Sequence, residues 1–139
     1  MKGIKIYLDI DGVLITKRNH RPVNNALTFL QLITTHFDPY WLTTHCNGSN
    51  DQALYYLSKF FDKDFISVAS IIKPTKWDNL KTNAIQILSD FYWIKDEPFN
   101  SEKLFLEKNH RLDRLIIPDY SKEADLTHLI TFFSKLIHP

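Results

Sequence analysis

Residues 4–14 of the chain read IKIYLDIDGVL, an apolar segment that runs into two carboxylates and a glycine. A short apolar segment that is rich in β-formers and bounded by turn residues predicts a buried strand. Asp9 and Asp11 then follow the carboxyl end of this strand, which is where open α/β sheets bind ligands. Two crowded carboxylates repel each other, so the pattern indicates a cation or a reaction that uses them. Metal-assisted phosphoryl transfer, with one carboxylate as nucleophile and the other as acid/base, has this requirement.

Length and composition indicate one soluble domain. The chain has 139 residues, of which 44% are hydrophobic and 24% are charged, values that are ordinary for a globular protein. We therefore expect a single domain over residues 1–139 with a core of ordinary size. Seventeen basic and sixteen acidic residues leave a net charge of +1, which gives no indication of nucleic-acid or membrane binding.

The cellular compartment is predicted from cysteine usage and from the first apolar run. Cys46 is the single cysteine, which excludes an intramolecular disulfide and suits a reducing compartment. Lys5, Asp9 and Asp11 interrupt the first apolar run before the core of a signal peptide forms. No stretch approaches the length that spans a bilayer, so we expect a cytoplasmic protein.

Short apolar segments alternate with amphipathic ones along the chain, which predicts an α/β fold with a largely parallel sheet. Residues 65–72 are left open as a strand or an irregular apolar connection. Asp38-Pro39 is expected to break the chain before the second strand, and Asn24 or Asn25 to cap the first helix. The predicted strands are residues 4–8, 40–43, 91–94 and 115–117, and the predicted helices are residues 26–33, 52–61, 78–88 and 126–137.

Four motifs follow one another along this framework. The first is Asp9-Ile10-Asp11-Gly12-Val13, and the second is Trp41-Leu42-Thr43-Thr44, in which a hydroxyl closes a strand. The third is a lysine at position 73, 76 or 81, and the fourth is Trp93-Ile94-Lys95-Asp96-Glu97. In this order, the motifs resemble those of the haloacid dehalogenase superfamily of phosphohydrolases. The resemblance covers nearly the whole chain. It implies a Rossmann-like three-layer sandwich with a mainly parallel central sheet and no sizeable cap domain.

The resemblance also implies roles for these residues. Asp9 would attack phosphorus and form an aspartyl-phosphate, while Asp11 would protonate the leaving oxygen and then help to activate water. Thr43 would hold a phosphoryl oxygen, with Gly12 and Thr44 as further substrate-binding positions. Donation by Asp11 near neutral pH needs a raised pKa, which the neighbouring acids favour.

The third motif is a lysine that neutralises the phosphoryl group and the nucleophile. Lys73, Lys76 and Lys81 all precede the fourth motif, and Lys81 has the spacing of small family members. Lys76 remains the alternative.

The fourth motif supplies acids that bind the metal, and here it reads Trp93-Ile94-Lys95-Asp96-Glu97. Lys95 stands where the first acid is often found, which is a departure from the family pattern. The implied Mg²⁺ ligands are the carboxylates of Asp9 and Asp96 and the main-chain carbonyl of Asp11, with Glu97 as a substitute.

The gaps between motifs leave no room for a cap domain, so an open site is expected. An open site suits bulky phosphorylated partners such as proteins, nucleic-acid ends or lipid head groups, although small phosphates also fit. The loop over residues 16–22 is either a solvated basic loop or a contact for a second anionic group. Its basic residues are Lys17, Arg18, His20 and Arg21. The oligomeric state does not follow from the sequence.

The function predicted first is a Mg²⁺-dependent phosphomonoester hydrolase that works through an aspartyl-phosphate. The alternative is a binding or regulatory module that kept the fold and lost efficient turnover, a hypothesis that Lys95 favours. Phosphotransfer to an acceptor other than water is a third hypothesis.

Overall fold

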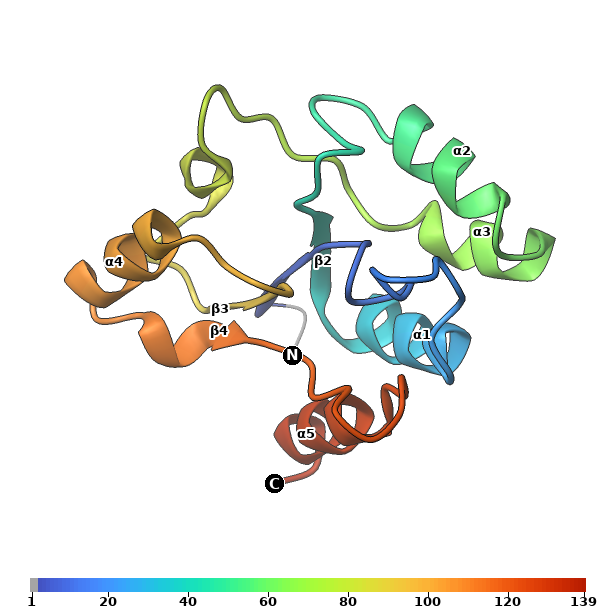
Figure 1. The fold of residues 1–139 in the computed structure, drawn as a ribbon. Coiled ribbons are helices and arrows are strands. Elements are labelled where there is room, and N and C mark those ends of the chain that lie inside the picture. The colour runs from blue at the N-terminus through green and yellow to red at the C-terminus, as the bar shows by residue number, and fades with distance from the viewer. Residues whose placement is uncertain (1–2) are drawn as a thin grey trace.

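A computed structural model describes residues 3–139, which form an all-parallel four-stranded sheet with helices around it (Figure 1). Residues 1 and 2, which belong to the domain predicted over 1–139, lie outside the described residues. The strand order is β2-β1-β3-β4. The strands are β1 (Lys5–Leu8), β2 (Asp38–Trp41), β3 (Phe91–Ile94) and β4 (Leu115–Ile116). The α/β class with a parallel sheet, predicted from the sequence, is confirmed.

Five α-helices and two short 3-10 helices occur in the described part of the chain. The α-helices are α1 (Ala26–His36), α2 (Asp51–Ser58), α3 (Lys63–Ala69), α4 (Asn100–Lys108) and α5 (Thr127–Ile137). The 3-10 helices are η1 (Lys81–Ala84) and η2 (Leu112–Arg114). Between residues 3 and 139 no helix has both the length and the apolar character needed to cross a membrane.

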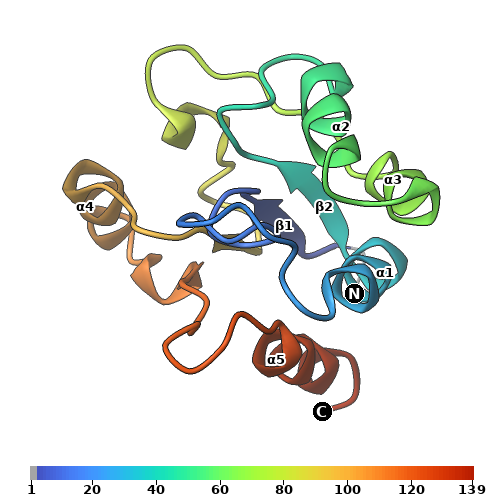
Figure 2. The same cartoon turned by 45° about the vertical axis from the view of Figure 1, so that its right-hand side comes forward.

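An apolar cluster lies on each face of the sheet. Side chains alternate between the faces of a strand, so Ile6 and Leu8 enter the larger cluster and Tyr7 enters the smaller one. Helices α1, α2, α3 and α5 contribute to the larger cluster, while α4 and residues 84–87 contribute to the smaller. Figure 2 shows α4 well apart from α1, α3 and α5. The resulting three layers are compatible with a Rossmann-like sandwich.

The order of the strands places a switch point at β1. The chain passes from β1 to β2 on one side and later returns to place β3 on the other side. In open α/β sheets, ligands bind outside the carboxyl ends of the strands at such a reversal. The two acids that follow β1 therefore lie where this topology favours a site.

The prediction for Asp38-Pro39 is wrong, because these residues open β2 instead of breaking the chain. Asp38 N donates to Ile4 O, and Leu42 N donates to Leu8 O, so alternate amides of this segment face β1. Pro39 falls between them, and its missing N–H lies on the side away from β1. A strand tolerates proline at such a position.

Two further secondary-structure predictions are wrong. Residues 78–88 form a loop with the single 3-10 turn η1, in which Leu88 is 92% exposed and Ile85 packs into the smaller cluster. Residues 65–72, predicted as a strand or connection, lie largely in α3, whose N-cap Asp62 accepts from Phe65 N. Helix α4 was not predicted, because Leu106 is its only buried apolar residue and the helical period is absent.

Asn25 stands at the N-cap position of α1, as predicted, but its side chain caps no backbone amide. Its Nδ2 instead donates to Asp125 Oδ1 and Thr127 Oγ1, at 3.1 and 3.3 Å. The residue therefore ties the start of α1 to the start of α5.

We expect Phe133→Ala to destabilise the fold strongly, because Phe133 is fully buried and its ring packs against those of Phe37 and Tyr92. Truncating a buried phenylalanine costs about 3–5 kcal/mol, because the site cannot collapse around the cavity. Urea unfolding measures the loss. Leu88→Ala is the control, with an expected change within about 0.5 kcal/mol. A similar loss in both variants would contradict this account of the core.

Candidate active site

The candidate site lies at the carboxyl ends of β1, β2 and β3. Asp9 follows β1, Thr43 comes two residues after β2, and Asp96 comes two residues after β3. Backbone hydrogen bonds join these ends: Asp9 N donates to Ile94 O at 3.1 Å, and Leu42 N donates to Leu8 O at 2.9 Å. The sheet therefore brings together three of the residues predicted from the sequence.

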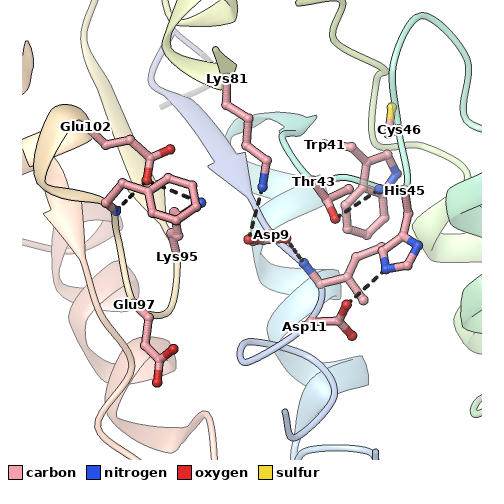
Figure 3. A network of polar contacts seen from close by, with 12 residues as sticks. Asp9, Asp11, Trp41, Thr43, His45, Cys46, Lys81, Lys95, Glu97 and Glu102 are labelled. Atoms are coloured by element: carbon pink, nitrogen blue, oxygen red, sulfur yellow. Dashed lines mark hydrogen bonds and ion pairs between the residues drawn. The ribbon is translucent and has the colours of Figure 1, made fainter. Parts of the chain in front are cut away.

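Asp9 is nearly buried, and its carboxylate has two partners. Ile10 N donates to Oδ1 at 2.8 Å, and Lys81 Nζ lies 3.6 Å from Oδ2. The second distance is that of an ion pair rather than a hydrogen bond. Figure 3 shows the Lys81 side chain reaching Asp9. Lys76 is exposed and Lys73 pairs with Asp38 at 2.7 Å, so Lys81 is the one of the three lysines that contacts Asp9.

A second buried ion pair lies beside the first. Lys95 Nζ is 3.4 Å from Glu102 Oε1, and each side chain is 6% exposed. Burial lowers the pKa of Lys81, the Asp9 carboxylate opposes this, and the nearby Lys95 ammonium lowers the pKa further. Lys95 therefore has its counterion in the first turn of α4.

Thr43 and Thr44 differ in their environment. Thr43 is 1% exposed, and its Oγ1 accepts from His45 N at 3.4 Å, while Thr44 is exposed. Figure 3 shows Thr43 beside Asp9 on the side away from Lys95. Of the two hydroxyls predicted to bind substrate, that of Thr43 lies within the site.

Asp11 is bound at both carboxylate oxygens. Tyr56 OH donates to Oδ1 at 2.6 Å, and His45 Nε2 lies 2.9 Å from Oδ2. Burial raises the pKa of Asp11, but the hydrogen bonds from Tyr56 and His45 outweigh it, so the pKa is lowered. The expectation of a raised pKa for Asp11 is wrong for the free protein, because α2 and the loop after β2 bring two hydrogen-bond partners to this carboxylate.

Gly12 makes room for Asp96. The φ of Gly12 is +81°, and a Cβ at this position would lie 2.4 Å from the Cβ of Asp96. Burial raises the pKa of Asp96, and the carboxylates of Glu97 and Asp9 add to this while Lys17 opposes it. Asp9 thus lies close enough to Asp96 for its charge to add to this shift.

Glu97 holds the basic loop beside the site. Its φ is +42°, a left-handed conformation that is uncommon for a residue other than glycine and often found at functional sites. Its carboxylate Oε2 accepts from Lys17 Nζ at 3.0 Å, with both side chains largely exposed. The loop over residues 16–22 is therefore anchored next to Asp96.

Within residues 3–139, no group of three or more His, Cys, Asp and Glu side chains could hold a metal ion. The set predicted from the sequence has only two side-chain ligands, Asp9 and Asp96, and a main-chain carbonyl at Asp11. All three donors are oxygens, and Mg²⁺ prefers oxygen ligands while keeping several waters. The donor set therefore fits Mg²⁺.

Sequence reasoning missed His45, Tyr56 and Glu102. His45 lies two residues after Thr43 in a loop of polar residues, and this proximity was the only available indication. Tyr56 lies on α2, which was predicted from its apolar residues and carried no sign of a polar contact. Glu102 lies on the helix that was not predicted.

Comparisons of the chain with models of protein families, with curated proteins and with solved structures give no match. The geometry of the site and the motifs of the chain therefore carry the functional argument.

We expect Gly12→Ala to destabilise the fold more than Gly48→Ala. Both glycines have a positive φ, but a Cβ at Gly48 meets nothing within 4 Å. Alanine in this conformation costs about 1–2 kcal/mol at either position. The contact with Asp96 adds about 1–3 kcal/mol of overpacking at Gly12 alone. Urea unfolding of the two variants isolates the contact, and equal losses would show that Asp96 does not pack against Gly12.

Proposed function

We propose that this protein is a Mg²⁺-dependent phosphomonoester hydrolase of the haloacid dehalogenase type, which forms an aspartyl-phosphate on Asp9. The observation that carries the proposal is the buried Asp9–Lys81 ion pair at the carboxyl end of the central strand. Asp11, Thr43 and Asp96 around this pair supply the other groups that the reaction needs.

In the first half-reaction Asp9 attacks phosphorus, the bond from phosphorus to the leaving oxygen breaks, and Asp11 gives that oxygen a proton. Ile10 N occupies Oδ1 of Asp9, which favours Oδ2, on the Lys81 side, as the attacking atom. Lys81 neutralises charge on the phosphoryl oxygens, and the Thr43 hydroxyl orients one of them.

In the second half-reaction a water oxygen bonds to phosphorus, its proton goes to Asp11, and the bond between Asp9 and phosphorus breaks. Inorganic phosphate leaves, and both carboxyl groups return to their starting states. The lowered pKa of Asp11 keeps its carboxylate ionised in the free protein, the form that can accept a proton. An anionic phosphoryl group beside Asp11 raises that pKa, which favours the protonated form that the first half-reaction needs.

Mg²⁺ would be held by the carboxylates of Asp9 and Asp96 and the carbonyl of Asp11. When bound, the cation neutralises phosphoryl charge that would otherwise repel a carboxylate nucleophile. Loss of activity on chelation is therefore part of the proposal.

The proposed substrate is a bulky phosphorylated partner. The side chain of Asp11 is 33% exposed. The loop over residues 16–22 lies beside it, and the ion pair of this loop, from Lys17 to Glu97, is exposed as well. Such an open site admits a phosphate on a protein, a nucleic-acid end or a lipid head group. Lys17, Arg18 and Arg21 would lie beside the rest of a partner of this kind.

The competing hypothesis, a binding module without efficient turnover, rests on Lys95. Lys95 pairs with Glu102, which is not one of the proposed metal ligands. Because the lysine has this separate counterion, it does not need to pair with Asp9 or Asp96, and this supports retention of turnover. Mg²⁺ or phosphate-analogue binding without hydrolysis of any ester would favour the binding module instead.

We expect Asp9→Asn to abolish Mg²⁺-dependent hydrolysis of an aryl phosphate, because the amide is not a nucleophile for phosphorus. Steady-state assays with and without a chelator measure this. Asp113→Asn is the matched control, since its side chain is 76% exposed and its activity should equal that of the wild type. Turnover by Asp9→Asn would contradict the assignment of the nucleophile.

We expect Lys81→Ala to lower kcat by about 10²–10³-fold, the usual effect of removing one group that stabilises transition-state charge. Lys76→Ala tests the alternative lysine and should keep wild-type kcat, because Lys76 is exposed and Lys81 contacts Asp9. Parallel kinetics on the two variants decide between them, and the reverse pattern would make Lys76 the catalytic lysine.

A further inference from the structure

Asp11 is joined to two side chains that no motif of the chain indicates. Tyr56 comes from α2 and His45 from the loop after β2, and they lie 45 and 34 residues away in the sequence. At 2.6 and 2.9 Å both contacts have hydrogen-bond length. The carboxylate that would move the proton is therefore held at each of its oxygens.

The two rings also hold each other. The rings of His45 and Tyr56 stack with centroids 3.8 Å apart and planes within 11°, and Phe60 packs edge-on against Tyr56 at 5.4 Å. A carboxylate bound by a free side chain can turn about its bonds. One that is bound by two packed rings stays in a single orientation, as catalytic groups require.

The two partners differ in what they can do for a carboxylate. Burial, together with the hydrogen bond to Asp11, raises the pKa of Tyr56 to about 12, so this phenol remains a donor at neutral pH. His45 Nε2 donates or accepts according to its tautomer. Oδ1 of Asp11 thus has a hydrogen-bond donor, Tyr56, at neutral pH. Oδ2 has His45 as its partner, which can donate to the ionised carboxylate or accept from the protonated carboxyl group.

We propose that Tyr56 and His45 are positioning residues, which hold Asp11 in the orientation that delivers its proton to the leaving oxygen. The inference rests on the proposed function. The reacting atoms remain those of Asp11, Asp9 and the ester, and the two rings act only through Asp11.

This role predicts a dependence on the leaving group. A poor leaving group such as an alkoxide needs a proton as its bond to phosphorus breaks, whereas a dinitrophenolate leaves without one. Loss of the positioning contact should therefore slow the alkyl ester selectively. A contact that only joins α2 to the loop would slow both esters alike when it is removed.

The experiment compares kcat/KM for ethyl phosphate and dinitrophenyl phosphate. Tyr56→Phe keeps the stacked ring and removes only the hydroxyl, so the fold should persist, which the melting temperature checks. We expect a loss of about 10–100-fold on ethyl phosphate, part of the 10²–10⁴-fold worth of general acid catalysis, and less than about 3-fold on dinitrophenyl phosphate. Tyr55→Phe is the matched control: Tyr55 directly precedes Tyr56 and is 69% exposed, so this variant should match the wild type on both esters.

His45 is tested with a conservative and a disruptive variant. His45→Gln places an amide that can reach Asp11 and should keep most of the ethyl phosphate activity. His45→Leu removes the hydrogen bond and should repeat the selective loss of Tyr56→Phe.

A double mutant tests whether the residues act through Asp11. In an Asp11→Asn background, Tyr56→Phe should cause no further loss on ethyl phosphate, because groups that act as one unit are not additive. A multiplicative loss would overturn the positioning role, and so would equal losses on both esters for Tyr56→Phe alone.

The same assays separate this inference from the proposed function. Full activity of Asp9→Asn, or a wild-type protein that hydrolyses neither ester with Mg²⁺, overturns the proposed function and the positioning role together. A wild-type enzyme that depends on Asp9 but shows no selectivity in Tyr56→Phe overturns the positioning role alone.

Discussion

Strand β1 is hydrogen-bonded along both edges, and the candidate site depends on this position. Its last residue, Leu8, is in register with Trp41 of β2 and with Ile94 of β3. Because all the strands are parallel, the residues that follow them emerge at one edge of the sheet. Asp9, Thr43 and Asp96 meet there although they come from three parts of the chain, and a slip of one residue in register would turn each strand's side chains to the opposite face.

Buried charge is the second constraint on the site. The side chains of Asp9, Lys81, Lys95 and Glu102 form two neighbouring ion pairs, with acids at the outside and the two ammonium groups between them. A buried charge is tolerated only when it is paired. Removal of one partner leaves the other charge buried and unpaired, so that its desolvation is no longer compensated. This arrangement of charges therefore extends from Asp9 into the first turn of α4, and Lys95 is part of it.

The sequence allowed the central strand, its two acids and the alternation of strands and helices to be predicted, because each depends on residues that are neighbours in the chain. The failures have physical causes. Residues 78–88 have apolar side chains at helical spacing, yet the structure leaves Leu80 and Leu88 exposed and packs Ile85 from an extended backbone. The contacts of His45 and Tyr56 with Asp11 could not be predicted, since they form only when the loop after β2 and helix α2 pack beside β1.

Glu102 has two tasks, since its Oε1 accepts a hydrogen bond from Phe99 N at the start of α4 and also lies 3.4 Å from Lys95 Nζ. This double use links two positions in evolution. An acid at position 95 would be buried against Glu102 with no cation between them and would repel it. Replacement of Glu102 first would leave Lys95 without its counterion and α4 without this bond at its start. Either single step passes through a less stable protein, so positions 95 and 102 are expected to change together or not at all.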